Sequence, residues 1–125
     1  RDNDKNVVIC NDKKLGRLMW QDEKQGFKVT WDEAQKYCKT LSLAGYKDWR
    51  LPTKVELLSI ADHSRYNPAL NTAFKYIADP KYSDYWSQTK YAVNSSYPWF
   101  VGFSLGYAGL NCVYCRPFVR CVRQY

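Results

Sequence analysis

Histidine is nearly absent from this sequence: His63 is its single copy, and it stands in the run Asp62-His63-Ser64. Neighbouring residues of a helix point about 100° apart, so these three side chains cannot align as orienting acid, base and nucleophile. No serine lies in a Gly-x-Ser-x-Gly motif. The scarcity of histidine argues against a hydrolase triad, and we expect a protein that is not an enzyme.

Long apolar runs are also missing. No stretch reaches the roughly 18 residues that a transmembrane helix needs, so we expect no membrane span. The chain opens with Arg1-Asp2-Asn3-Asp4-Lys5, without the apolar block of a signal peptide. Such a start fits a mature or excised fragment and does not exclude secretion.

Patterns of metal ligands are sparse. The Asn11-Asp12 turn lacks the spaced acidic ligands of an EF-hand loop. Cys10, Cys112 and Cys115 could ligate zinc, but His63 is the one nitrogen candidate for a fourth ligand. We therefore predict neither a metal nor any other cofactor.

Aromatic residues and basic charge, in contrast, are abundant. The 125 residues include 11 Tyr and 5 Trp, and 46% are hydrophobic, which excludes a disordered chain. A chain of this length forms one domain with one core, so we expect a single domain over residues 1–125. The 19 basic against 12 acidic residues give a net charge of +7, which favours a polyanionic partner such as sulfated glycan, nucleic acid or an anionic surface.

Two capping boxes mark the starts of two helices. Thr30–Glu33 and Thr53–Glu56 have the spacing at which each side chain bonds the backbone N–H of the other residue. The first helix is predicted from residue 31 to about residue 43, with Cys38 on its apolar stripe, and the second from residue 54 to about residue 62.

The connector between these helices, residues 45–57, carries two apolar side chains around an arginine. Pro52 keeps Leu51 extended, so the chain must turn sharply before the second helix. We expect Trp49 and Leu51 to plug the core, because large aromatic side chains dominate small cores. Arg50, between them, is predicted to be largely buried and paired with a carboxylate or with backbone carbonyls.

Apolar or alternating segments on both sides of the helices predict strands at residues 7–9, 15–20, 84–89, 99–105 and 118–122. The first two should form a hairpin, residues 65–83 should be irregular, and residues 106–109 should form a turn. This order predicts an α+β fold with an antiparallel sheet.

Motifs spread along nearly the whole chain carry a family resemblance. In order they are Gly16-Arg-Leu-Met-Trp-Gln21, Trp31-x-x-Ala34-x-x-Tyr37-Cys38-x-x-Leu41, Gly45-Tyr-Lys-Asp-Trp-Arg-Leu-Pro-Thr-Lys-x-Glu-Leu57, Tyr85-Trp-Ser-Gln-Thr89, Trp99-Phe-Val-x-Phe103 and Val119-Arg-Cys-Val-Arg123. They resemble a bacterial domain family named for the C-terminal domain of the Legionella collagen-like adhesin. The resemblance implies a fold related to C-type lectins and formylglycine-generating enzymes: one lectin-like domain whose two helices pack on a small antiparallel sheet with long irregular loops.

Five cysteines are many for a cytosolic chain of this length without a metal site. The resemblance implies a disulfide between Cys38 and Cys121, because C-type lectin-like folds tie the first helix to the final strand; two buried thiols are the alternative. Cys112 and Cys115 have the spacing of a redox pair, but they lead into a strand and lack the helix that would stabilise a thiolate. We expect one of them to bridge to Cys10 or to its neighbour, which leaves an odd thiol.

Together these features predict a recognition or adhesion domain that is secreted, on the cell surface or periplasmic, and that binds an acidic or sulfated polysaccharide. The resemblance to the terminal domain of an adhesin points the same way. Arginine pairs bidentately with sulfate and tyrosine covers sugar rings, which makes the candidate ligand-binding residues Tyr107, Tyr114, Arg116, Arg120 and Arg123. An ordinary basic surface is the alternative. No Glu-Pro-Asn, Gln-Pro-Asp or Trp-Asn-Asp triplet supports calcium-dependent sugar binding.

Two further functions compete with this prediction. A formylglycine-generating oxidoreductase would hold copper between Cys112 and Cys115, but the spacing is shorter than in that family and the chain is far shorter than those enzymes. Nucleic-acid binding agrees with the charge and the aromatic content but is opposed by the expected disulfide. An oligomer is compatible with the sequence.

Overall fold

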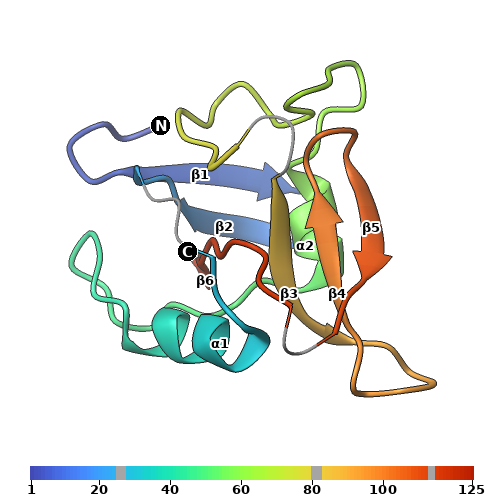
Figure 1. Cartoon of the computed structure of the whole chain (residues 1–125). Coiled ribbons are helices and arrows are strands. Elements are labelled where there is room, and N and C mark those ends of the chain that lie inside the picture. The colour runs from blue at the N-terminus through green and yellow to red at the C-terminus, as the bar shows by residue number, and fades with distance from the viewer. Residues whose placement is uncertain (25–27, 80–82, 113–114) are drawn as a thin grey trace.

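Two antiparallel sheets and two short helices make up the fold. The computed structural model of the chain describes residues 1–24, 28–79, 83–112 and 115–125. Its elements are β1 (Val7–Asp12), β2 (Gly16–Gln21), α1 (Trp31–Thr40), α2 (Lys54–Ser59), β3 (Asp84–Lys90), β4 (Pro98–Gly102), β5 (Tyr107–Leu110) and β6 (Val122–Gln124). Figure 1 shows α1 below the first sheet and α2 behind the second. The predicted α+β class is confirmed.

The prediction of one small sheet is wrong. β1, β2 and β6 form one sheet, and β3, β4 and β5 form another. The last segment of the chain divides between them, because Phe118 bridges to Tyr85 of β3 and Val122 pairs with Trp20 of β2. Residues 107–110, predicted to lie largely in a turn, pair with β4 as strand β5.

Both helices begin where their capping boxes predict. The Thr30 side chain accepts from the backbone N–H of Glu33, the Thr53 side chain accepts from that of Glu56, and each glutamate accepts from its N-cap N–H. Each capping box thus satisfies two backbone N–H groups that would otherwise lack a partner at the start of its helix.

Both helices end earlier than predicted. α1 ends at Thr40, because the chain then turns through Ala44 and Gly45, whose φ angles of 57° and 82° are left-handed. α2 ends at Ser59, because Ala61 already forms a bridge to the loop that follows. No helix among the described residues is long and apolar enough to cross a membrane.

The connector between the helices is part of the core. Trp49 and Leu51 are each 3% exposed, which confirms their role as plugs. The Trp49 indole N–H donates to the backbone carbonyls of Leu43 and Tyr46 at 3.2 Å, so its burial leaves no polar atom without a partner.

Arg50 is paired as predicted but is not largely buried. Its guanidinium donates to both carboxylate oxygens of Glu56 at 2.7 Å, and its backbone pairs with that of Val122. The Arg50 side chain is 36% exposed, whereas that of Glu56 is 8% exposed. The carboxylate is the buried partner because it also caps α2.

The five cysteines form two disulfides and leave one free thiol. Cys38 of α1 is bonded to Cys121, the pair that the family resemblance implies. Cys112 is bonded to its neighbour Cys115, so the alternative bridge to Cys10 is not formed. Cys10, on β1, is the odd thiol, and burial raises its pKa.

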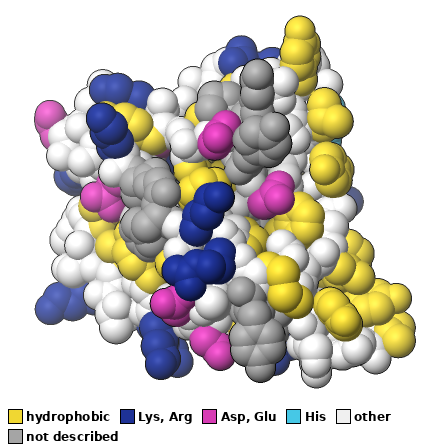
Figure 2. Space-filling view, viewed as in Figure 1, with side chains coloured by type: hydrophobic (Ala, Val, Ile, Leu, Met, Phe, Trp, Pro, Cys, Tyr) yellow, Lys and Arg dark blue, Asp and Glu magenta, His cyan; other side chains and the backbone are white. Residues whose placement is uncertain are grey.

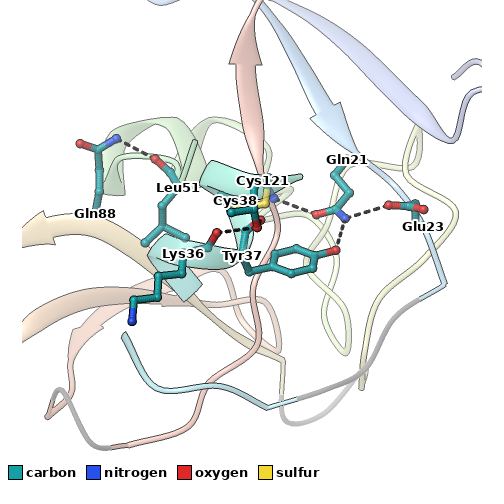
Figure 3. The surroundings of a disulfide bond; sticks show 9 residues. Gln21, Glu23, Lys36, Tyr37, Cys38, Leu51, Gln88 and Cys121 are labelled. Atoms are coloured by element: carbon teal, nitrogen blue, oxygen red, sulfur yellow. Dashed lines mark hydrogen bonds between the residues drawn. A yellow bond between two sulfur atoms is a disulfide. The ribbon is translucent and has the colours of Figure 1, made fainter. Parts of the chain in front are cut away.

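A polar network surrounds the Cys38–Cys121 bridge (Figure 3). Gln21 of β2 accepts from the Cys121 backbone N–H at 3.0 Å and donates to the Tyr37 hydroxyl at 2.7 Å. Gln21 and Cys121 are both fully buried. The disulfide therefore joins α1 to the first sheet at a point where the backbone of the last segment is also fixed.

Candidate functional site

A hollow opens where the segment before α1, the start of β3 and the connection from β5 to β6 meet. It has a volume of about 220 Å³ and is lined by Lys28, Asp84, Asn111, Arg116, Pro117 and Phe118. We call it the Arg116 hollow. On the face seen in Figure 2, Lys and Arg side chains gather in the middle, with Asp and Glu side chains on either side.

Backbone hydrogen bonds hold the walls of the Arg116 hollow together. The Val29 N–H donates to the Pro117 carbonyl at 3.0 Å, and the Phe118 N–H donates to the Asp84 carbonyl at 2.8 Å. The Trp86 N–H in turn donates to the Phe118 carbonyl at 3.0 Å. Three segments far apart in the sequence are thus locked side by side, and the hollow is formed before any ligand arrives.

Arg116 is the exposed cation of this hollow. Its guanidinium donates to the Lys28 carbonyl at 3.0 Å and lies 3.6 Å from the Glu33 carboxylate. The two side chains of this ion pair are 56% and 53% exposed, so solvent screens it and it contributes little to stability. Because a guanidinium has five N–H donors, Arg116 keeps donors for an anion.

Lys28 and Phe118 line the hollow together with Arg116. The Lys28 ammonium lies 5.9 Å from the centroid of the Phe118 ring, a distance at which the ring face attracts the cation. Phe118 itself is 7% exposed. The ring therefore holds the lysine side chain over the hollow and leaves its ammonium available to solvent or ligand.

Asp84 supplies the opposite charge. No described residue donates a hydrogen bond to its carboxylate, and burial raises the pKa of Asp84. Gly102 of β4 lies directly opposite, and a Cβ there would stand 2.7 Å from one Asp84 carboxylate oxygen. Because Gly102 has no side chain, the partly buried Asp84 carboxylate fits into the wall of the hollow, where it can accept hydrogen bonds.

Two cations, a carboxylate and the Asn111 amide suit a ligand that carries both hydroxyl groups and an anionic substituent. Hydroxyl groups can donate to Asp84 and Asn111, while Arg116 and Lys28 can pair with sulfate or carboxylate. Across the described parts of the chain, no three His, Cys, Asp or Glu side chains gather as a metal site would require.

Among the predicted ligand-binding residues that the structure describes, only Arg116 lines the hollow. Tyr107 begins β5 and is 52% exposed, outside the set that lines it. Tyr114 lies outside the described residues. Arg123 is held by Asp48 at 2.7 Å and 3.1 Å and stacks on the Tyr46 ring at 3.7 Å, so its donors already have a partner.

Arg120 is buried rather than available to a ligand, which corrects its prediction as a binding residue. It is 3% exposed, and its guanidinium donates to the backbone carbonyls of Gln21 and Tyr76 and pairs with Asp22. Its partners are far away in the sequence, so no local pattern separates Arg120 from the exposed arginines around it.

The sequence alone did not indicate Lys28, Asp84 and Asn111 as site residues. Lys28 and Asp84 reach the hollow through pairing between distant segments, Val29 with Pro117 and Asp84 with Phe118, and Asn111 is held by the bond from its N–H to the Pro98 carbonyl. One local signal was present, because Asp84 is the first residue of a predicted strand, next to a loop, and loops often carry the polar side chains of a site.

Comparison with known proteins gives one family. The family model described as the Lcl C-terminal domain matches residues 9–123, a span that includes every residue lining the Arg116 hollow. No curated protein matches the chain.

Proposed function

The chain belongs to the Lcl C-terminal domain family, and on that premise we propose that it is an extracytoplasmic adhesion domain that binds acidic or sulfated polysaccharide in the Arg116 hollow. It acts as a lectin-like binding module rather than as an enzyme. Two disulfides support this location, because such bonds persist in oxidising compartments.

One observation carries the proposal: Arg116 is an exposed, weakly paired guanidinium beside a second cation, in a preformed hollow that also offers hydroxyl acceptors. A sulfate or uronate group pairs with Arg116 and Lys28, and neighbouring hydroxyls donate to Asp84 and Asn111. The net charge of +7 attracts a polyanion from a distance.

Aromatic contacts extend the proposed surface beyond the hollow. The half-exposed ring of Tyr107 remains a candidate for stacking on a sugar farther along the polymer, and Tyr114 keeps the same proposed role. Arg123 is a weaker candidate, because a ligand would have to displace Asp48 from it.

Binding of a fluorescent heparin by charge-matched variants tests the proposal. Lys28→Gln/Arg116→Gln removes the two cations of the hollow, and Lys13→Gln/Lys14→Gln removes two exposed lysines from the turn between β1 and β2. We expect the first variant to bind at least about tenfold more weakly than the second, since it loses two charge-assisted contacts. Equal affinities would place the site elsewhere.

A further inference from the structure

A second cavity lies in the long loop between α2 and β3, seen as the green-to-yellow loop at the top of Figure 1. Its volume is about 290 Å³, and its lining includes Arg65, Asn71, Thr72, Phe74, Lys75 and Ile77. We call it the loop pocket. None of the described residues that line it also lines the Arg116 hollow. Loops of this length without helix or strand are uncommon in compact domains, and many of them are functional.

A buried carboxylate fixes one wall of the loop pocket. Asp22 is 0% exposed, and it accepts from the backbone N–H groups of Lys75 at 2.8 Å and Tyr76 at 3.0 Å. Arg1 and Arg120 neutralise the same carboxylate, and Arg120 also donates to the Tyr76 carbonyl. Residues 75 and 76 are therefore attached to the end of β2, although they lie in no helix or strand.

The floor of the pocket is equally fixed. Phe74 is 9% exposed. Its ring and that of Trp20 pack edge to face with their centroids 6.3 Å apart, and the Arg120 guanidinium lies 4.9 Å from the centroid of the Phe74 ring. On the opposite side, the Asn71 N–H donates to the Ile60 carbonyl at 2.9 Å. A binding site held this firmly loses little conformational entropy when a ligand enters.

The rim carries two exposed cations, Arg65 and Lys75, neither of them in a salt bridge with a described carboxylate. Hydrogen bonds from Ser64, and then the charge of Arg65, lower the pKa of Asp62, so Arg65 has an acidic neighbour. The Lys75 ammonium instead lies 5.3 Å from the Tyr76 ring. Between the cations and the apolar floor stand the polar side chains of Asn71 and Thr72.

We propose that the loop pocket binds a single carboxylate-bearing sugar unit, such as a hexuronic acid. Its carboxylate pairs with Arg65 and Lys75, the apolar face of its ring packs on Phe74 and Ile77, and its hydroxyls bond Asn71 and Thr72. A volume of about 290 Å³ is at the lower limit of ligand sites, which suits one sugar ring rather than a chain.

Amide chemical shifts of the folded protein test this proposal with methyl β-D-glucuronide as the probe. We expect saturable shifts at residues 65–77 and no response to methyl β-D-glucoside, which lacks the carboxylate. An equal response to sodium sulfate would overturn the proposal, because the sugar ring would then contribute nothing. Absence of any shift in residues 65–77 would also overturn it.

Variants separate this site from the Arg116 hollow. Arg65→Gln and Lys75→Gln change exposed side chains, so both should fold, and each should weaken glucuronide binding by about tenfold, the loss of one charge-assisted contact. Arg116→Gln should leave the glucuronide-induced shifts at residues 65–77 unchanged while it weakens heparin binding. Glucuronide-induced shifts at residues 65–77 that persist in both Arg65→Gln and Lys75→Gln would refute the loop pocket, and heparin binding unchanged by Arg116→Gln would refute the polysaccharide hollow alone.

Discussion

At the scale of single residues, two aspartates have opposite electrostatic roles. Burial raises the pKa of Asp84, whereas the hydrogen bond from Arg123 lowers the pKa of Asp48. A carboxyl group whose pKa is raised in the folded state stabilises the fold below its ordinary, unfolded-state pKa. This stabilisation is lost as pH rises through the pKa that the group has in the folded state. A group with a lowered pKa stabilises the fold above its ordinary pKa and loses that effect as pH falls through the folded value.

Asp84→Asn should therefore raise the melting temperature near neutral pH, because it removes a charge that the fold does not stabilise. The gain should vanish near about pH 3, where Asp84 is protonated in both states. Asp48→Asn is the matched control and should lower the melting temperature near neutral pH. A lower melting temperature for Asp84→Asn under those conditions would show that the carboxylate has a stabilising partner.

Asp22 connects the N-terminus, the long loop and the last segment. Burial alone would raise the pKa of Asp22, but hydrogen bonds from the Lys75 N–H, from Arg1 and from the Tyr76 N–H outweigh it and lower that pKa. Asp22→Asn should cost about 3–5 kcal/mol in urea denaturation, because it leaves the buried Arg120 without its counter-charge. Asp4→Asn, an exposed change of equal charge, should cost less than about 0.5 kcal/mol. Similar costs for the two variants would refute this role for Asp22.

Residue chemistry alone could not separate the arginines of the last segment. Arg116, Arg120 and Arg123 look alike in the sequence, yet one is exposed, one is buried against Asp22 and one is held by Asp48. The proposed binding site therefore has Arg116 beside Lys28 in place of the clustered arginines.

At the scale of elements, local signals located the starts of helices and strands but not their partners. Capping boxes placed the first residue of both helices, since their chemistry is contained within four residues. The two sheets could not be predicted, because β6 joins β2 across about a hundred residues and β3 joins β4 nearby. Hydrophobic periodicity indicates which face of a strand is buried, but it does not indicate which strand lies beside it.

The two capping boxes offer a matched comparison of buried and exposed glutamates. Glu56→Gln should cost about 1–3 kcal/mol, because it weakens both the cap of α2 and the bidentate pair with Arg50. Glu33→Gln should cost clearly less, since the Glu33 carboxylate is exposed and its ion pair with Arg116 is 3.6 Å long. Denaturant titration of the two variants measures the difference, and equal losses would contradict it.

At the scale of the whole molecule, the two disulfides should contribute unequally. Cys38 and Cys121 are separated by 83 positions, and Cys112 and Cys115 by 3. In the chain-entropy account, losing the first costs roughly 4–5 kcal/mol and losing the second about 2 kcal/mol. Peptide mapping without reduction first verifies the two pairs in the parent protein. Denaturant unfolding then compares the stability of two double variants, Cys38→Ala/Cys121→Ala and Cys112→Ala/Cys115→Ala. A larger loss from the second variant would contradict this ranking.

The proposed recognition surface is likewise a property of the whole molecule. The charge of +7 and the aromatic content could be read from the sequence, and they pointed to a polyanionic ligand. The Arg116 hollow and the loop pocket could not be predicted from the sequence, because each is assembled by contacts between distant segments. Phe118 contacts Asp84 in the hollow, and Lys75 contacts Asp22 at the loop pocket.

The salt dependence of heparin binding tests the central claim most directly. Each cation that pairs with a sulfate releases a counterion from the polymer, so affinity should fall steeply as salt rises. We predict that Lys28→Gln/Arg116→Gln flattens the slope of log affinity against log salt, whereas Lys13→Gln/Lys14→Gln leaves the slope close to that of the parent protein. Identical slopes for both variants, or no binding by the parent protein at low salt, would contradict recognition of a polyanion in the Arg116 hollow.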